Sequence, residues 1–202
     1  MRIAVLVEGQ TELAFKKPLQ LFLSTKLQDR MPALRFHPYN GRIPKEEKLG
    51  RIVRNLLTQG NQVCDEVIAL SDVYTGTSDF SDADDAKQKM KLWVGNEPRF
   101  HAHVALHDFE AWLLPYWGEI QRLAKSNRAS PGNRPELINH GRPPSKVLAE
   151  VFENGKGRDS YSKTRDAARI LMGQSLEISA AACPELKAFL NTIIRLSGGI
   201  EI

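Results

Sequence analysis

Residues 2–12 read RIAVLVEGQTE, an apolar run that leads directly into an acidic, glycine-containing turn. The run is almost without polar residues, which is typical of a strand buried on both faces of a parallel sheet. Glu8 stands where this strand is expected to end, and Gly9 removes side-chain bulk where the chain turns. The stretch therefore predicts a buried strand that continues, through an acidic turn, into a helix.

The alternation of strand and helix patterns continues outward from this stretch. Further strands are predicted at 33–39, 63–70 and 101–106, and helices at 13–23, 44–59, 83–94 and 109–117. Four such alternations indicate a mainly parallel four-stranded sheet with helices on its faces. Past residue 118 only helical patterns recur, at 145–153, 163–173 and 184–196. We expect a Rossmann-like α/β core at residues 1–118 and a helical C-terminal extension at 119–202, packed as a single structural unit.

Composition excludes several classes of protein. Hydrophobic residues make up 42% of the chain and charged residues 26%, as in ordinary globular domains. Cys64 and Cys183 lie far apart, which argues against a disulfide framework or a thiolate zinc site. No segment approaches the ~20 consecutive apolar residues that a membrane span needs, and the acidic N-terminal turn does not fit a signal peptide. We therefore expect a cytoplasmic protein without a membrane partner.

Charge is unevenly distributed along the sequence. Residues 1–115 carry equal numbers of basic and acidic side chains, whereas residues 116–170 carry 11 basic against 6 acidic. A basic stretch beside a locally acidic half suits a protein that binds a polyphosphate with one part and a metal with another. A solvated basic helical surface explains the same stretch without any ligand.

Carboxylates follow three of the predicted strands. Glu8 follows the first, Asp72 the third, and Asp108 with Glu110 the fourth, while Glu12 lies one helical turn after Glu8. In open parallel sheets, ligands bind beyond the carboxyl ends of the strands. Mg²⁺ prefers oxygen ligands, and a cation relieves the repulsion between converging carboxylates. The sequence thus predicts a Mg²⁺ (or Mn²⁺) site formed by Glu8, Glu12, Asp72, Asp108 and Glu110.

Each of these acids also has a purely structural explanation. Glu8 or Glu12 would suit the first turn of a helix, where the helix dipole favours negative charge. Asp72 is suited to a turn, and Asp108 to the N-cap of the helix expected from Phe109 onward. The occurrence of acids at three separate strand ends favours the metal site over these separate explanations.

The motifs together resemble a known family. EGQTE at 8–12 resembles the opening motif of Toprim domains, particularly those of the OLD (overcoming-lysogenization-defect) nucleases. Further segments resemble the Toprim-like bacterial family catalogued as domain of unknown function 4276, and they are DVYTG at 72–76 with Phe80, HDFEAWLL at 107–114, Pro144-Ser145, Tyr161-Ser162-Lys163 and Cys183-Pro184. The resemblance covers nearly the whole chain and implies a Toprim-like fold.

The resemblance also implies roles for individual residues. In Toprim nucleases a first-strand glutamate serves as general acid/base or metal ligand, a role that falls on Glu8, and an Asp-x-Asp pair binds magnesium. Asp72 matches the first aspartate, but Tyr74 stands where the second would be, so Glu12, Asp108 or Glu110 must complete the site. Position 108 is usually glutamate in the resembled family, and aspartate shortens its reach.

The function implied is that of a Mg²⁺-dependent nuclease acting on nucleic acid, DNA rather than RNA, with an ATPase partner in DNA metabolism or phage defence. Glu8 and Lys163 are the candidate catalytic residues, Lys163 (alternatively Lys146) neutralising charge on the phosphate. The chain has no phosphate-binding loop of the GxxxxGK[ST] type, so ATP hydrolysis would belong to the partner.

Two other functions remain open at this point. One is a non-catalytic Toprim-like regulatory or interaction module, which Tyr74 in place of an acid favours. The other is a reaction on a small nucleotide. A zinc site of His101, His103 and His107 is set aside, because three histidines spread along one strand span too far for a tetrahedral site; His107 stays a possible neighbour of the acids.

Overall fold

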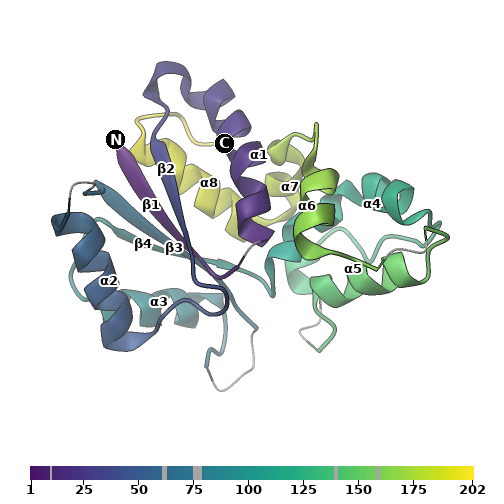
Figure 1. Cartoon of the computed structure of the whole chain (residues 1–202), viewed down its shortest axis with the longest axis horizontal. Coiled ribbons are helices and arrows are strands. Elements are labelled where there is room, and N and C mark those ends of the chain that lie inside the picture. Colours follow the sequence, from purple (N-terminus) through teal and green to yellow (C-terminus); the bar gives the residue numbers. More distant parts are fainter. Residues whose placement is uncertain (10, 61–62, 75–78, 139–140, 158–159) are drawn as a thin grey trace.

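A computed structural model describes residues 1–9, 11–60, 63–74, 79–138, 141–157 and 160–202. Within these residues the chain forms a four-stranded, fully parallel sheet with the order β2-β1-β3-β4 (Figure 1). The strands are β1 (Arg2–Val7), β2 (Ala33–Pro38), β3 (Glu66–Asp72) and β4 (Phe100–Ala105). The predicted α/β sheet is confirmed. Gln10, Asn61 and the Thr75-Gly76 part of the family motif lie outside the described residues.

The two central strands explain why their sequences are so apolar. β1 and β3 lie between neighbours and are covered on both faces, so that Ile3 to Val7 and Val67 to Ala69 are completely buried. β3 extends two residues beyond its predicted end at Leu70, because Ser71 and Asp72 pair with Val104 and Ala105 of β4. Asp72 is therefore the last residue of a strand and not the first residue of a loop.

Helices cover both faces of the sheet (Figure 1). On one face, α2 (Glu46–Thr58) and α3 (Ala83–Val94) pack with the sheet around residues such as Leu6, Val53 and Met90. On the other face lie α1 (Thr11–Leu27), which leads into a short 3-10 turn η1 (Gln28–Arg30), and α8 (Pro184–Leu196).

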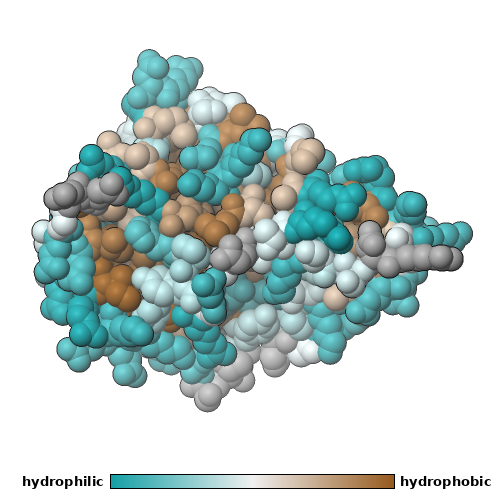
Figure 2. Space-filling model, viewed as in Figure 1, coloured by the Kyte–Doolittle hydropathy of each residue, from teal (hydrophilic) through white to brown (hydrophobic). Residues whose placement is uncertain are grey.

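The rest of the chain is helical. It comprises η2 (Phe109–Tyr116), α4 (Trp117–Ala124), η3 (Pro135–Leu137), α5 (Pro144–Glu153), α6 (Lys163–Leu171) and α7 (Leu176–Ala182). The helix predicted at 109–117 is a 3-10 helix until Tyr116; its Pro115 lacks the backbone N–H that a regular α-helix would use. Figure 2 shows a mostly hydrophilic surface over α4 and α6.

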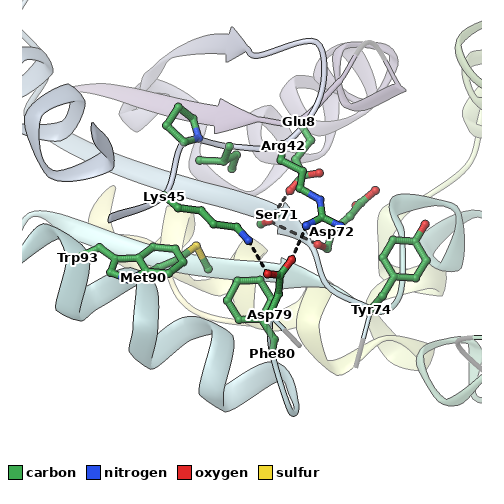
Figure 3. A pocket seen from close by; sticks show the side chains of 12 residues that line it. Glu8, Arg42, Lys45, Ser71, Asp72, Tyr74, Asp79, Phe80, Met90 and Trp93 are labelled. Atoms are coloured by element: carbon green, nitrogen blue, oxygen red, sulfur yellow. Dashed lines mark hydrogen bonds and ion pairs between the residues drawn. The ribbon is translucent and has the colours of Figure 1, made fainter. Parts of the chain in front are cut away.

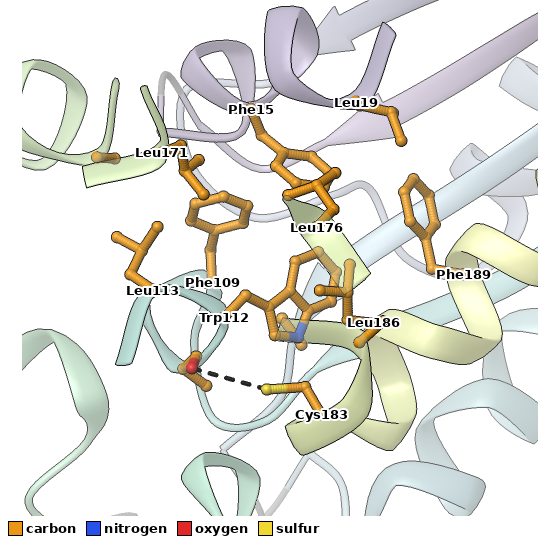
Figure 4. Packing of buried hydrophobic residues seen from close by; sticks show 14 of the residues in the cluster. Phe15, Leu19, Phe109, Trp112, Leu113, Leu171, Leu176, Cys183, Leu186 and Phe189 are labelled. Carbon is orange, nitrogen blue, oxygen red and sulfur yellow. Dashed lines mark hydrogen bonds between the residues drawn. The ribbon is translucent and has the colours of Figure 1, made fainter. Parts of the chain in front are cut away.

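An aromatic cluster joins these helices to the sheet. Trp112 of η2 packs against Phe109 of the same element, Phe15 of α1 and Phe189 of α8, with ring centroids 5.4–6.0 Å apart (Figure 4). Aromatic side chains bury large apolar areas, so this cluster accounts for much of the packing energy between the elements. It holds η2, which begins directly beyond the carboxylate-bearing end of β4, in a defined position.

Among the described residues, no helix is both long and apolar enough to cross a membrane.

Candidate functional site

Strand register brings the predicted acids to one edge of the sheet. Val7 pairs with Leu70, so Glu8 lies level with Ser71 and beside Asp72. Asp72 pairs with Ala105, after which the chain turns through residues 106–108 into η2. We call the set Glu8, Glu12, Asp72, Asp108 and Glu110 the carboxylate rim.

Glu8 is held against the end of β3. Its Oε1 accepts a hydrogen bond from the Ser71 hydroxyl (Figure 3). Burial raises the pKa of the Glu8 carboxyl, and Glu12 raises it further, against the lowering effects of the Ser71 hydroxyl, Arg42 and the Asp72 backbone N–H. The carboxylate of Glu8 is therefore hydrogen-bonded to the residue that directly precedes Asp72.

Asp72 lies at the centre of the rim. Its Oδ1 accepts a hydrogen bond of 3.1 Å from the Phe109 backbone N–H, which caps the start of η2. The pKa of Asp72 is raised well above its ordinary value, first by burial and then by the negative charges of the four other acids, Glu12, Glu8, Asp108 and Glu110. Segments far apart in the sequence thus place the four other predicted carboxylates close enough to Asp72 to raise its pKa.

Glu12 lies in the first turn of α1 and is almost completely buried. Its Oε2 accepts a hydrogen bond of 3.2 Å from the Gly9 N–H. Burial raises the pKa of the Glu12 carboxyl in spite of that bond. The position matches the structural explanation of a helix N-terminal acid, and the charge of Glu12 also raises the pKa of Asp72.

Asp108 is fully buried at the N-cap position of η2, but its side chain does not cap that helix. Its Oδ2 accepts hydrogen bonds from the Ser145 backbone N–H at 3.1 Å and from the Tyr74 hydroxyl at 3.4 Å. Its Oδ1 is buried without a hydrogen-bond partner among the described residues. Burial raises the pKa of the Asp108 carboxyl.

Glu110 is 1% exposed, and its Oε1 contacts both Tyr161 and Lys163. The Tyr161 hydroxyl donates to it at 3.4 Å, and the Lys163 Nζ lies 3.3 Å away. Its Oε2, like the Asp108 Oδ1, has no hydrogen-bond partner in the described part of the chain. Burial, together with the charge of Asp108, raises the pKa of Glu110 to about 7.

Lys163 is the first residue of α6 and is half exposed. Burial lowers its pKa, but Glu110 and Asp108 outweigh that effect, so the net shift is upward and the ammonium is retained. The alternative lysine, Lys146, makes no ion pair with the rim among the contacts of the described residues. Of the two candidate lysines, Lys163 is therefore the one that contacts the carboxylate rim.

A divalent cation fits this donor set by its chemistry. The donors are carboxylate oxygens, which hard cations prefer, and the two buried oxygens without partners are costly to leave uncompensated. As the side chains are placed, however, no group of three His, Cys, Asp or Glu in the described residues is arranged so that it could hold an ion. The structure thus supplies the charge and the donors, but not a closed coordination sphere.

The histidines of the fourth strand have other partners. His101 Nε2 lies 2.8 Å from Glu66 Oε2, and His103 Nε2 lies 3.0 Å from Thr192 Oγ1. His107 falls beyond the end of β4, where its ring stacks near that of Tyr74, with centroids 6.4 Å apart.

Sequence reasoning missed several neighbours of the rim. A pocket beside Glu8 and Asp72 is also lined by Arg42, Lys45 and Asp79 (Figure 3). Arg42 and Lys45 follow β2 as Glu8 follows β1 and Asp108 follows β4, so the same strand-end argument could have identified them. Ser71 directly precedes Asp72. Tyr161 belongs to the Tyr161-Ser162-Lys163 segment of the family resemblance, but no strand-end pattern places it beside Glu110.

Comparisons with known proteins agree with the fold. The family model described as "Domain of unknown function (DUF4276)" matches residues 7–194. The C-terminal region of the Burkholderia pseudomallei OLD protein is similar in structure, with a TM-score of 0.55 and 13% identity over 97% of this chain and 98% of that one. The C-terminal region of the Xanthomonas campestris pv. campestris OLD protein gives 0.50 and 14%, over 98% and 96%. No curated protein matches the sequence. The expected Toprim-like fold is confirmed.

Proposed function

The chain belongs to the DUF4276 family, and we propose that it is a metal-dependent nuclease that hydrolyses phosphodiester bonds of nucleic acid at the carboxylate rim. The observation that supports this proposal is the mutual electrostatic strain of the rim. Glu8 after β1, Glu12 of α1, Asp108 before η2 and Glu110 within η2 all raise the pKa of Asp72. Two oxygens of these acids are buried without partners among the described residues. A protein gains nothing in stability from such an arrangement, which favours a ligand that compensates it.

Each residue of the site has a proposed role. Asp72, Asp108 and Glu110, with Glu8 and Glu12, would hold Mg²⁺ or Mn²⁺ after side-chain rotations that bring their oxygens together. Bound there, the ion would supply a Lewis acid and lower the pKa of a water molecule. Glu8, which lies at the pocket beside Asp72 and has its pKa raised by burial, would act as the general acid or base. Lys163 would stabilise negative charge that develops on the phosphate.

The substrate and setting are parts of the same proposal. The basic excess at residues 116–170 supports a polyanionic substrate. We take from the family resemblance the remaining parts of the proposal, which are DNA rather than RNA as substrate and an ATPase partner, in the cytoplasm, within DNA metabolism or phage defence.

A non-catalytic Toprim-like module is the second candidate, and Tyr74 favours it. Tyr74 stands where a metal-binding aspartate is expected, its hydroxyl donates to Asp108, and its own pKa is raised beyond the physiological range by burial and by Asp108. A neutral phenol cannot replace a carboxylate ligand. In this alternative the rim is a vestige, and the chain acts by binding a partner protein.

One experiment separates the two candidates. Wild-type protein, Glu8→Gln and the control Glu153→Gln, an exposed acid of α5, are incubated with supercoiled plasmid, single-stranded DNA and RNA in Mg²⁺, Mn²⁺ or EDTA. The nuclease proposal expects metal-dependent cleavage that falls at least ~100-fold in Glu8→Gln and not in the control. Calorimetric titration with Mn²⁺ then reads metal binding directly. Intact substrates together with no Mn²⁺ binding in the wild type would leave only the interaction module.

A further inference from the structure

A basic pair adjoins the carboxylate rim in the loop between β2 and α2. Arg42 and Lys45 both line the pocket next to Glu8 and Asp72, and both bind the carboxylate of Asp79 (Figure 3). The Lys45 Nζ lies 2.8 Å from Asp79 Oδ1, and the Arg42 Nη1 binds Oδ2. One carboxylate therefore bridges two cations, which leaves a net positive charge at this side of the pocket.

Asp79 is held in this bridging position from a second direction. The Lys89 Nζ donates to its backbone carbonyl at 2.9 Å. Lys45 and Lys89 also lie against the ring of Phe80, at 5.5 and 5.6 Å from its centroid. These contacts hold the Asp79 carboxylate between Arg42 and Lys45.

Arg42 and Lys45 face the site and remain accessible to a ligand. The Arg42 side chain is 68% exposed, and those of Lys45 and Asp79 about one-third exposed. Arg42 is also close enough to Glu8 to influence its ionisation. A ligand bound by this pair would therefore lie next to the groups proposed to act on a phosphodiester, on the side of the rim that Lys163 does not occupy.

We infer that Arg42 and Lys45 form a binding subsite for a phosphodiester group of a nucleic-acid strand, and that the Asp79 carboxylate occupies this subsite in the free protein. The inference rests on the proposed function. Carboxylate and phosphate oxygens present similar acceptor geometry to a guanidinium and an ammonium, so one replaces the other without rearranging the donors. Binding of the strand then requires the displacement of Asp79.

This arrangement predicts opposite effects from neighbouring residues. Removing a cation removes phosphate contacts and weakens binding, whereas removing the Asp79 carboxylate removes a competitor and strengthens binding. A general basic surface predicts no such specificity of position, because every charge change of the same sign would act alike.

The test is a binding titration with a fluorescent single-stranded DNA of about 16 nucleotides that has no terminal phosphate. Anisotropy is measured in EDTA and again in Ca²⁺, for wild type, Arg42→Gln, Lys45→Gln and Asp79→Asn. Matched controls are Arg51→Gln, an exposed cation of α2, and Asp29→Asn, an exposed acid of η1. Inorganic phosphate is added as a competitor in a separate series.

We expect Arg42→Gln and Lys45→Gln to raise the Kd by about tenfold, and each to reduce the slope of log Kd against log salt by about 0.7. Asp79→Asn should lower the Kd by about threefold or more, and both controls should change it by less than about twofold. Binding that inorganic phosphate abolishes as effectively as unlabelled DNA would assign the subsite to free phosphate instead and overturn the inference.

An Asp79→Asn variant that binds no better than Asp29→Asn also overturns the inference, as does an equal effect of Arg42→Gln and Arg51→Gln. These readouts do not require cleavage. Failure of the nuclease proposal, seen as intact DNA in Mg²⁺ and Mn²⁺, is therefore distinguishable from failure of the subsite, seen as unaltered binding in EDTA.

Discussion

Asp166 and Asp108 are equally buried, at 0% exposure, yet their surroundings are opposite. Both oxygens of Asp166 have partners: the Ser162 N–H donates at 2.8 Å and the Arg165 guanidinium at 2.9 and 3.0 Å, with Arg169 at 3.4 Å. These donors hold the pKa of Asp166 below its ordinary value, although burial alone would raise it. Asp108 has two donors on one oxygen, none on the other within the described residues, and a raised pKa.

The comparison teaches that burial of an acid does not by itself identify a functional site. Glu136 shares one property with each of the two aspartates. It is buried and its pKa is raised, but the Trp112 indole and the Glu185 backbone N–H satisfy its oxygens at 3.1–3.2 Å. The rim differs in combining burial, like charges and oxygens without donors, which is costly unless a cation is present.

Replacing the two aspartates one at a time should give the largest difference in stability. Asp166→Asn should lower the free energy of unfolding by about 2–3 kcal/mol, because it breaks two ion pairs and weakens the start of α6. Asp108→Asn in EDTA should be neutral or stabilising, because it removes a charge that has no counter-charge on one oxygen. Urea unfolding at pH 7.5 measures both. Equal destabilisation by the two variants would contradict the distinction drawn between these acids.

The pH dependence of stability tests the same distinction at Glu110. The pKa of Glu110 rises from its ordinary value of 4.5 to about 7 in the folded chain, so the folded state binds this proton more tightly. The associated stability is complete below pH 4.5 and is lost as the pH rises through 7. In EDTA, Glu110→Gln should therefore be more stable than wild type by about 2 kcal/mol at pH 8, and similar to it at pH 4.5.

Other titrating groups are controlled for by comparing wild type with Glu110→Gln at each pH. His103 is buried with its pKa lowered to about 3, so its stability contribution is present above pH 6.5 and is lost as the pH falls. It acts equally in wild type and Glu110→Gln and cancels. A constant stability difference from pH 4.5 to 8 would refute the role given to Glu110.

Divalent metal should stabilise the protein through the carboxylate rim and not through Asp166. At ten times its Kd, Mg²⁺ should stabilise the wild type by about 1.4 kcal/mol, or raise Tm by about 3 °C. Asp166→Asn should retain this shift on a lower baseline, and Glu8→Gln should lose most of it. Thermal unfolding with and without Mg²⁺ measures the shift, and a shift of the same size in Glu8→Gln would place the ion elsewhere.

Tyr74 provides the smallest expected effect. Tyr74→Asp restores the aspartate pair of the resembled motif, and it should tighten Mn²⁺ binding by about threefold to tenfold while lowering stability in EDTA through added repulsion. Tyr74→Phe, which also removes the hydroxyl donor to Asp108 but adds no charge, is the matched control. Calorimetry showing equal affinities in both variants would mean that position 74 does not face the ion.

Much of the fold could be predicted from the sequence, because buried parallel strands are recorded as short apolar runs and their carboxyl ends must share an edge. The same rule located Glu8, Asp72 and Glu110 on that edge from the sequence alone. Other features depend on tertiary contacts that no local pattern records. Asp166 and Asp108 both precede or begin helical segments and look alike in sequence, and only the donors around them distinguish the two.

The predicted catalytic and metal-binding roles of these residues remain predictions, as does the division at residue 118. Arg42 and Lys45 show that the strand-end rule extends beyond acids, since basic residues that follow β2 satisfy the same geometry. Their pairing with Asp79 could not have been foreseen, because it depends on a tertiary contact between residues that lie 37 and 34 positions apart in the sequence.

The bond from the Phe109 amide to Asp72 has a practical consequence for mutagenesis. Asp72 is the residue that an investigator would replace first, yet its carboxylate also anchors the start of η2, whose Trp112 belongs to the aromatic cluster beneath α1 and α8. Loss of activity after Asp72→Ala would therefore combine two effects, a displaced η2 and a missing carboxylate in the site. Among the described residues, the Glu8 side chain accepts its hydrogen bond from Ser71 and does not anchor η2, so a substitution at Glu8 tests the chemistry with less disturbance of the fold.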